Sequence, residues 1–344
     1  MDSRARSARW MVAAVAGVAG LLVGLIAGLN YLVNPFGIYS THLFEPIVLH
    51  SRTEKMKLYR FAEPAPEVLV LGGSSSFSMP PAYITELTGR PAFNASLHGG
   101  VPEDYLAFLR YIISLRKVPK LLIVPMSVEM VRPNLPTGFE PHNPLEPYLQ
   151  EKAGNRLEAV RWLLTLQQTV ASLHLLTIET GTRPSAHYRF DPDGRAHFRV
   201  SPASLDQIVD AYMATKEWGP DLFRFRALDA TQLSHFRDFL ALAHRLDIKV
   251  IVYVPPLYPR AVAFYEKEAN LLSLRADLLE RLRAWQAEGL IAAVHDFTRL
   301  DSFGGNATEF HDLAHPTVEA SRRMLDLMLG SRNGMPTGSP RPAS

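Results

Sequence analysis

A run of branched apolar residues that gives way at once to glycines and serines constrains this chain more than any other stretch. Residues 68–79 read VLVLGGSSSFSM. Four consecutive apolar residues are typical of a parallel strand that is covered on both faces, and such strands place functional groups at their carboxyl ends. The stretch therefore predicts a buried strand that ends in a sharp polar turn, with Ser74, Ser75 and Ser76 at the edge of an open α/β sheet.

The same strand-then-helix order recurs along the chain. Further apolar runs lie at 92–95, 120–124, 249–254 and 291–297, and helical patterns lie at 101–115, 230–246, 273–287 and 316–329. Strands that alternate with helices predict a doubly wound parallel sheet. We expect one α/β domain over residues 67–330, followed by a tail at 331–344 that is rich in Gly, Pro and Ser and is predicted to be disordered.

The alternation is interrupted between about residues 132 and 200. Several prolines come first, then an amphipathic helical pattern at 157–176, then two short alternating runs at 188–200 around the sequence Asp-Pro-Asp-Gly. Such a turn between two alternating runs is a hairpin signal. This block is predicted to be an insertion or cap on the sheet domain.

The N-terminal region contains a long uncharged run. Residues 11–33 carry no charge, and Arg4, Arg6 and Arg9 precede them. A helix needs ~20 apolar residues to cross a membrane. We therefore predict a cytoplasmic segment at 1–9, an uncleaved transmembrane anchor at 10–33 and, by the positive-inside rule, everything after it outside the cell membrane. A cleaved signal peptide, which has a shorter apolar run, is the alternative.

These features imply a single-pass protein of a bacterial inner membrane whose C-terminal domain is periplasmic or otherwise extracytoplasmic. A juxtamembrane segment at 34–66 would join the anchor to the domain. It carries Arg52, Lys55, Lys57 and Arg60, which we interpret as a solvated face or one that contacts lipid headgroups.

Charge and composition narrow the possible partners. The chain has 36 Lys and Arg against 34 Asp and Glu, a formal net charge of +2, with no dominant basic cluster. We therefore expect no nucleic-acid partner. Cysteine is absent, which excludes disulfides and thiolate metal sites. No group of His, Asp and Glu has convincing metal-ligand spacing, so neither a metal nor a cofactor is expected.

Ser74 is the first candidate for chemistry. A serine on a tight strand-to-helix turn projects its hydroxyl at the sheet edge, while the following helix directs backbone N–H groups toward a developing anion. Gly72 and Gly73 permit the turn and leave room for a reacting carbonyl group. An ordinary Gly/Ser loop is the alternative interpretation.

The sequence Asp312-Leu313-Ala314-His315 is the second candidate. A serine nucleophile needs a base, and the base needs an acceptor that fixes its tautomer and orientation. Asp312 and His315 are three residues apart on a loop that precedes the last helix, where a sheet enzyme would use them. With 12 histidines in the chain, the match is informative only because of this position. Both His98 and His311 are better interpreted as ordinary surface or core histidines.

A third block supports the first two. Residues 94–100, after the second predicted strand, contain Asn94, Gly99 and Gly100. A backbone N–H from Gly99 and the side-chain amide of Asn94 could both help to hold an oxyanion. Alternatively, Asn94 caps the local turn.

These pieces, in this order, resemble an SGNH (GDSL-type) hydrolase. The resemblance rests on Gly72-Gly73-Ser74, on the block from Asn94 to Gly100, and on Asp312-x-x-His315. It implies a three-layer flavodoxin-like sandwich in which Ser74 is acylated, His315 is its base and Asp312 orients His315. The N–H groups of Ser74 and Gly99 would bind the oxyanion, and Gly73, Asn94 and Gly100 would line the same site.

Within that superfamily, the anchor, the sequence Asn34-Pro35-x-Gly37 and the inserted block are similar to those of bacterial extracytoplasmic members, such as alginate O-acetylation proteins and the D-alanine transfer protein of teichoic acid. The resemblance implies ester hydrolysis or O-acyl transfer on a cell-envelope polysaccharide or a small ester, with a membrane acyltransferase as a potential partner. The rival interpretation is a non-catalytic envelope protein that binds glycan or acts as a scaffold.

One departure from the family pattern favours that rival. The third family block normally supplies Gly-x-Asn, whereas this chain has Val124-Pro125-Met126-Ser127. Loss of one oxyanion donor typically costs ~2.7 to 4 kcal/mol of transition-state stabilisation. Ser127, or a residue of the insertion, could take its place.

Overall fold

A computed structural model describes residues 3–35, 39, 41, 43–44, 51–133, 143–149, 163–177, 188–198, 203–215 and 218–330. The chain divides into two compact units, one formed by residues 1–54 and 150–187 and the other by residues 55–149 and 188–344. The tail predicted to be disordered, and much of the proline-rich stretch, lie outside the described residues. The candidate active site lies entirely in the second unit.

The first unit contains the predicted anchor. Helix α1 spans Ser3–Val33, and its residues 9–33 are long and apolar enough to cross a membrane, a property that a signal sequence shares. The side-chain amide of Asn30 donates to the carbonyl oxygen of Leu163 at 2.7 Å and to the hydroxyl of Thr169 at 2.9 Å. These bonds attach helix α7, Leu166–Thr177, to the end of α1. The first residues of the helix that we predicted at 157–176 lie outside the described residues.

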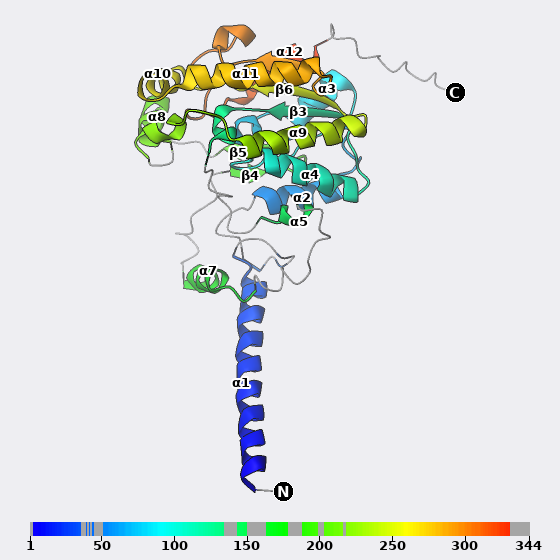
Figure 1. The fold of residues 1–344 in the computed structure, drawn as a ribbon, viewed down its shortest axis with the longest axis vertical. Helices are drawn as coiled ribbons and strands as arrows, with labels where there is room; N and C mark the ends of the chain where they lie inside the picture. The colour runs from blue at the N-terminus through cyan, green and yellow to red at the C-terminus, as the bar shows by residue number, and fades with distance from the viewer. Residues whose placement is uncertain are drawn as a thin grey trace, which may run out of the picture. The chain divides into compact units, whose positions relative to one another are not determined.

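The second unit is built on a sheet of five parallel strands, as the alternating pattern predicts (Figure 1). The strand order is β2-β1-β3-β6-β7, the flavodoxin-type order once the strands of this sheet are counted along the chain. The chain moves from β1 to one side and then returns to the other, so the order reverses between β1 and β3. Ligands bind at such a switch point, beyond the carboxyl ends of the strands. The strands are β1 Val68–Val70, β2 Ala92–Asn94, β3 Leu121–Pro125, β6 Lys249–Val254 and β7 Ala293–Asp296.

Helices cover both faces of this sheet because its strands are apolar on both sides. Leu69, Leu122 and Val252 belong to a core with α4, α9 and α11, in which α4 and α9 pack side by side (Figure 1). Val70 and Ile123 belong to a second core with α3 and α12. The resulting three layers match the predicted architecture. The bounds of these helices are α3 Pro81–Thr88, α4 Pro102–Ser114, α9 Ala230–Arg245, α11 Leu271–Ala287 and α12 Val318–Leu329.

Several shorter elements were not predicted from the sequence. Helix α2 is the most informative of them, because it contains Arg52 and Lys55, which are 1% and 0% exposed. The interpretation of these two residues as part of a solvated face is therefore wrong. Tyr59 of α2 packs edge-on against Phe93 and Phe108, which draws the helix into the core. A helix was expected directly after the serine turn, but a single 3-10 turn lies at Ser74–Ser76 and α3 begins only at Pro81. Among the described residues, the helices that were not predicted are α2 Ser51–Phe61, α5 Glu146–Leu149, α8 Leu205–Met213 and α10 Pro259–Glu268.

The predicted hairpin is present. Strands β4, Tyr188–Phe190, and β5, Ala196–Phe198, pair antiparallel around the Asp-Pro-Asp-Gly turn. The hairpin belongs to the second unit, whereas residues 150–187 of the predicted insertion group with α1. The insertion is thus divided between the two units, and its hairpin lies in the same unit as the candidate site.

Candidate active site

The serine turn begins directly where strand β1 ends. Gly73 precedes a single 3-10 turn at Ser74–Ser76, and the N–H of Phe77 donates to the carbonyl oxygen of Ser74 at 3.0 Å. A β-carbon added to Gly72 would lie 2.0 Å from the ring of Pro125. A glycine is needed there because the turn packs directly against the end of β3. This packing places Ser74 at the switch point of the sheet.

The second glycine block meets the same turn. A β-carbon on Gly100 would lie 2.7 Å from the carbonyl oxygen of Gly72, and one on Gly73 would lie 2.3 Å from the methyl group of Met130. The N–H of Leu97 donates to that same Gly72 oxygen at 2.8 Å. The segments that follow β1, β2 and β3 therefore converge at one edge of the sheet.

Ser74, His315 and Asp312 form a continuous hydrogen-bonded chain. His315 Nε2 lies 2.8 Å from Ser74 Oγ, and His315 Nδ1 lies 2.8 and 2.7 Å from the two carboxylate oxygens of Asp312. The side chains of His315 and Asp312 are only 13% and 10% exposed. An imidazole held between a hydroxyl and a carboxylate is the arrangement that activates a serine nucleophile. The structure brings together the three residues that the sequence pattern singled out.

The loop that carries His315 is closed on itself. The N–H of His311 donates to the carbonyl oxygen of His315 at 2.8 Å, and that of Thr317 donates to Glu309 at 3.0 Å. The N–H of Tyr258 bonds the carbonyl oxygen of Leu313 at 2.9 Å, which ties the loop to the end of β6. Helix α12 begins only after these contacts, so it starts two residues later than predicted.

The environment of Asp312 keeps its carboxyl group ionised. Burial by itself raises the pKa of Asp312. The neighbouring His315 and the N–H groups of Ala314 and His315 lower the pKa by more than burial raises it, so it lies below its ordinary value. Those two N–H groups donate to Asp312 Oδ1 at 2.9 and 3.0 Å. An ionised carboxylate favours the His315 tautomer with the proton on Nδ1, which leaves Nε2 free to accept a proton from Ser74.

The neighbouring serines do not share the position of Ser74. Ser76 Oγ bonds the carbonyl oxygen of Gly73 at 2.8 Å and lies 2.6 Å from Ser96 Oγ. Ser75 Oγ is buried and has no hydrogen-bond partner among the described residues. Ser74 is thus the serine of this turn that reaches an imidazole.

The candidate oxyanion donors separate into two groups. Among the described residues, neither the backbone N–H of Ser74 nor that of Gly99 donates to a backbone carbonyl oxygen. The N–H of Gly100 already donates to Leu97 at 3.2 Å. Gly100 and Gly73 therefore fit as residues that allow close packing of the loops.

Asn94 does not have the geometry of an oxyanion donor. Its amide nitrogen donates to the carbonyl oxygens of Ser76 at 2.8 Å and Met79 at 3.0 Å, and its amide oxygen accepts the N–H of Ser96 at 3.0 Å. Both amide hydrogens are thus used within the protein. Asn94 holds the serine turn in place, which corresponds to the local role that the sequence left as the alternative.

The segment that follows β3 packs against the serine turn. Pro125 packs on Gly72, and Ser127 Oγ is buried without a hydrogen-bond partner among the residues that the structure describes. The segment directly after β3 thus supplies, among its described residues, a buried hydroxyl and no side-chain amide.

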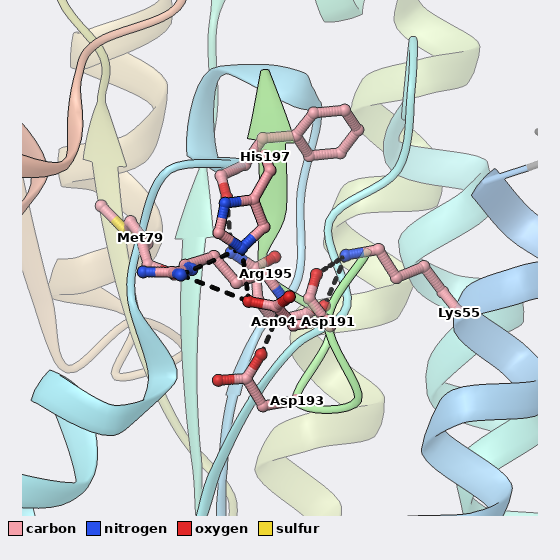
Figure 2. A network of polar contacts seen from close by, with 9 residues as sticks. Lys55, Met79, Asn94, Asp191, Asp193, Arg195 and His197 are labelled. Atoms are coloured by element: carbon pink, nitrogen blue, oxygen red, sulfur yellow. Dashed lines mark hydrogen bonds and ion pairs between the residues drawn. The ribbon is translucent and has the colours of Figure 1, made fainter. Parts of the chain in front are cut away.

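Lys55 links Asn94 to the hairpin. Figure 2 shows its amine reaching from α2 toward the backbone of Asn94 and of the hairpin turn. Lys55 Nζ donates to the carbonyl oxygen of Asn94 at 2.7 Å and to that of Gly194, and the N–H of Asn94 donates to Asp193 at 2.9 Å. Burial lowers the pKa of Lys55 well below its ordinary value, and the Asp193 carboxylate partly opposes this shift. No sequence motif marked this contact.

Gly194→Ala tests how strongly this link depends on close backbone approach. Gly194 has φ +84°, and a β-carbon there would lie 2.1 Å from the carbonyl oxygen of Asn94. We expect the variant to lose more than about 2 kcal/mol of unfolding free energy, from backbone strain and the clash together. Gly289→Ala is the matched control, because Gly289 has φ +79° with no atom within 4 Å, and should cost only about 1 to 2 kcal/mol. If urea denaturation gave equal losses of unfolding free energy for Gly194→Ala and Gly289→Ala, the clash at Gly194 would be contradicted.

Comparisons with known proteins give little beyond this geometry. No protein-family model matches the chain, and no curated protein matches it. Among solved structures, one from Bacteroides fragilis described as a putative acylhydrolase is similar, with a TM-score of 0.37 and 13% identity over 80% of this chain and 91% of that chain.

Within the described ranges, no three His, Asp or Glu side chains are grouped so that they could hold a metal ion.

Proposed function

We propose that this protein is a serine-dependent acyl ester hydrolase or O-acyltransferase of the SGNH type, with Ser74 as the nucleophile. The observation that carries the proposal is the hydrogen-bonded chain from Ser74 through His315 to Asp312 at the switch point of the sheet. The N–H groups of Ser74 and Gly99, neither of which donates to a backbone carbonyl oxygen among the described residues, support it, because ester chemistry needs donors where negative charge develops.

In the acylation step, Ser74 Oγ attacks the ester carbonyl carbon while its proton passes to His315 Nε2. The carbonyl oxygen becomes an oxyanion, which the N–H groups of Ser74 and Gly99 stabilise. The carbon–oxygen bond to the leaving alcohol then breaks, and the alcohol takes the proton from His315. Asp312 holds Nδ1–H throughout and stabilises the imidazolium that forms between the two proton transfers.

In the second step an acceptor hydroxyl removes the acyl group from Ser74. His315 Nε2 takes the proton of the acceptor as it attacks, and Ser74 Oγ leaves and recovers that proton. Water as acceptor gives hydrolysis, and a sugar hydroxyl gives O-acyl transfer. The residues described above serve both outcomes equally, so the choice depends on which acceptor reaches the acyl-enzyme.

The substrate class follows from the proposed location. If α1 is an uncleaved anchor, the positive-inside rule places the second unit outside the cytoplasmic membrane. The proposed substrate there is an acylated glycan of the cell envelope or a small ester, as the family resemblance implies. A transferase would need an acyl donor, and a membrane acyltransferase partner is proposed to supply it.

A product assay on the full chain in detergent micelles tests the proposal. The wild-type chain should release p-nitrophenol from p-nitrophenyl acetate faster than the Ser74→Ala variant does. The acetyl group should be recovered as acetate, or as a sugar ester when an oligosaccharide acceptor is supplied. A folded wild-type chain whose release rate equals that of Ser74→Ala would contradict the proposal and favour the non-catalytic, glycan-binding interpretation.

A further inference from the structure

The hairpin lays an aromatic face on the catalytic loops. In β5, Ala196 and Phe198 share one face of the ribbon, and Phe190 pairs with Ala196 across it. Phe190 packs edge-on against Phe77, three residues after Ser74, with the ring centroids 5.6 Å apart. Phe198 contacts the same Phe77 ring at 6.1 Å. The inner face of the hairpin thus lies against the serine turn.

Phe198 also contacts the loop that carries the candidate base. Its ring is stacked on that of His311 at 4.6 Å with an interplanar angle of 25°, and it lies 5.1 Å from the ring of His315 at 46°. Phe198 is half-buried and therefore remains partly accessible beside the reacting atoms. A residue that comes from the insertion thus contacts the imidazole that Ser74 and Asp312 hold.

The hairpin is fixed at its turn. Lys55 Nζ donates to Gly194 in that turn, and lies 4.2 Å from the centre of the Phe190 ring. The N–H of Ala196 donates to the carbonyl oxygen of Phe77 at 3.2 Å. These contacts, together with the bond from the N–H of Asn94 to the carbonyl oxygen of Asp193, join the hairpin to α2, to β2 and to the serine turn, so the position of Phe198 is set by the sheet domain.

The hydrogen bonds of the His315 ring only weakly restrain one motion, a tilt of the ring about the line that joins its two nitrogens. Its bonds to Asp312 and Ser74 lie at opposite ends of the ring, so they oppose movement along the line that joins the two nitrogens. They resist a tilt of the ring about that line only weakly, because hydrogen bonds tolerate some angular deviation. The Phe198 ring, which lies beside that of His315 with a centroid separation of 5.1 Å and an interplanar angle of 46°, opposes that tilt by steric contact.

We propose that Phe198 is a positioning residue for His315, and that the β4–β5 hairpin is the element that completes the active site by holding Phe198 there. The inference rests on the proposed function, since it concerns the same base. Small displacements of a reacting group can cost as much as 10²-fold in rate, so a ring that blocks the tilt has a measurable effect on turnover.

Phe198→Ala is the principal variant, assayed in the full chain with p-nitrophenyl acetate. We expect kcat per active site to fall about 10- to 100-fold with KM changed less than about threefold, because the base is displaced while substrate contacts remain. The number of active sites is counted by titration with a fluorophosphonate. A merely structural role would reduce the fraction of chains that react and leave kcat per reactive site unchanged.

Conservative and control variants keep the test decisive. Phe198→Tyr retains the ring and should restore kcat to within about threefold of wild type, whereas Phe198→Leu, which should still fold, retains bulk without an aromatic face and should restore less. His197→Ala is the matched control, since His197 is the adjacent residue on the opposite face and its Nε2 forms hydrogen bonds with Asp191 and Arg195 of the same hairpin. Its kcat should stay within about twofold of wild type. A kcat per site unchanged in Phe198→Ala would overturn the inference.

Imidazole NMR separates this inference from the proposed function. With ¹⁵N-labelled histidine, and His315→Ala to assign the signals, wild type should give one sharp pair of His315 ring signals. In Phe198→Ala they should broaden or split, because the ring samples more than one orientation. If wild type shows no turnover, the proposed function falls, and unchanged signals in Phe198→Ala would then refute the positioning role independently.

Discussion

Ser74→Ala and His315→Ala are each expected to lower kcat by a factor on the order of 10⁴ or more, with the double variant scarcely worse than either single variant. The reason is that both residues serve one proton transfer, across the 2.8 Å contact between His315 Nε2 and Ser74 Oγ. Once one partner is gone, the other has nothing to accept from or donate to. Wild type, the two single variants and the double variant form a double-mutant cycle, which is measured by steady-state turnover of p-nitrophenyl acetate.

Ser75→Ala is the control for that cycle. Ser75 Oγ is buried without a hydrogen-bond partner among the described residues, so its removal deprives no other group of a bond. We expect turnover and thermal stability close to those of wild type. Ser74→Ala should also unfold at nearly the wild-type temperature, because Ser74 is half-exposed at the sheet edge. Losses that multiply in the double variant would show that the two residues act in separate steps.

Asp312→Asn is expected to lower kcat by about 10³- to 10⁴-fold, a loss similar to or milder than that of the His315 variant. The amide can still hydrogen-bond His315 Nδ1, but it can donate to that nitrogen and so favours the wrong tautomer. It also removes the negative charge that stabilises the imidazolium. Turnover and the ¹⁵N signals of the imidazole ring should change together, and wild-type turnover in this variant would contradict the proposed role of Asp312.

The same variant should change how stability depends on pH. The pKa of Asp312 is lowered in the folded protein, since the effects of His315 and the backbone N–H groups outweigh that of burial. A carboxyl whose folded pKa is lowered stabilises the fold above its ordinary pKa, and that contribution is lost as the pH falls through the folded value. As the pH is lowered from 7 to 3, the thermal midpoint of wild type should therefore fall more than that of Asp312→Asn, because only wild type has this contribution to lose.

The sequence identified the parts of this site that depend on local pattern. The apolar run at 68–71 is typical of a strand covered on both faces, and the glycines after it indicate a sharp turn. Asp312 and His315 are three residues apart, so one loop suffices to join them. Their meeting with Ser74 followed from the rule that parallel strands present their carboxyl ends at one edge.

The remaining features depend on contacts between distant segments. Phe198 is more than 100 residues from Ser74 and from His315 along the chain, and nothing in its own neighbourhood marks it as a contact of the site. Lys55 sits in a polar stretch that is typical of a solvated surface, yet it is 0% exposed because two carbonyl groups and an aromatic ring accept its amine. The direction of the Asn94 amide could not be predicted from the sequence either. The same local sequence is compatible with an oxyanion donor and with a residue that caps the local turn.

Fluorophosphonate labelling of the full chain in detergent micelles is the most direct test of the central claim, that Ser74 is an activated nucleophile. The reagent forms a stable phosphonyl ester only with a serine whose proton an adjacent base removes. Mass spectrometry of the intact chain should show one adduct, and fragmentation of the labelled peptide should place it on Ser74 and on neither Ser75 nor Ser76. His315→Ala should abolish it. A folded chain that acquires no adduct, or that acquires it on another serine, would contradict the account.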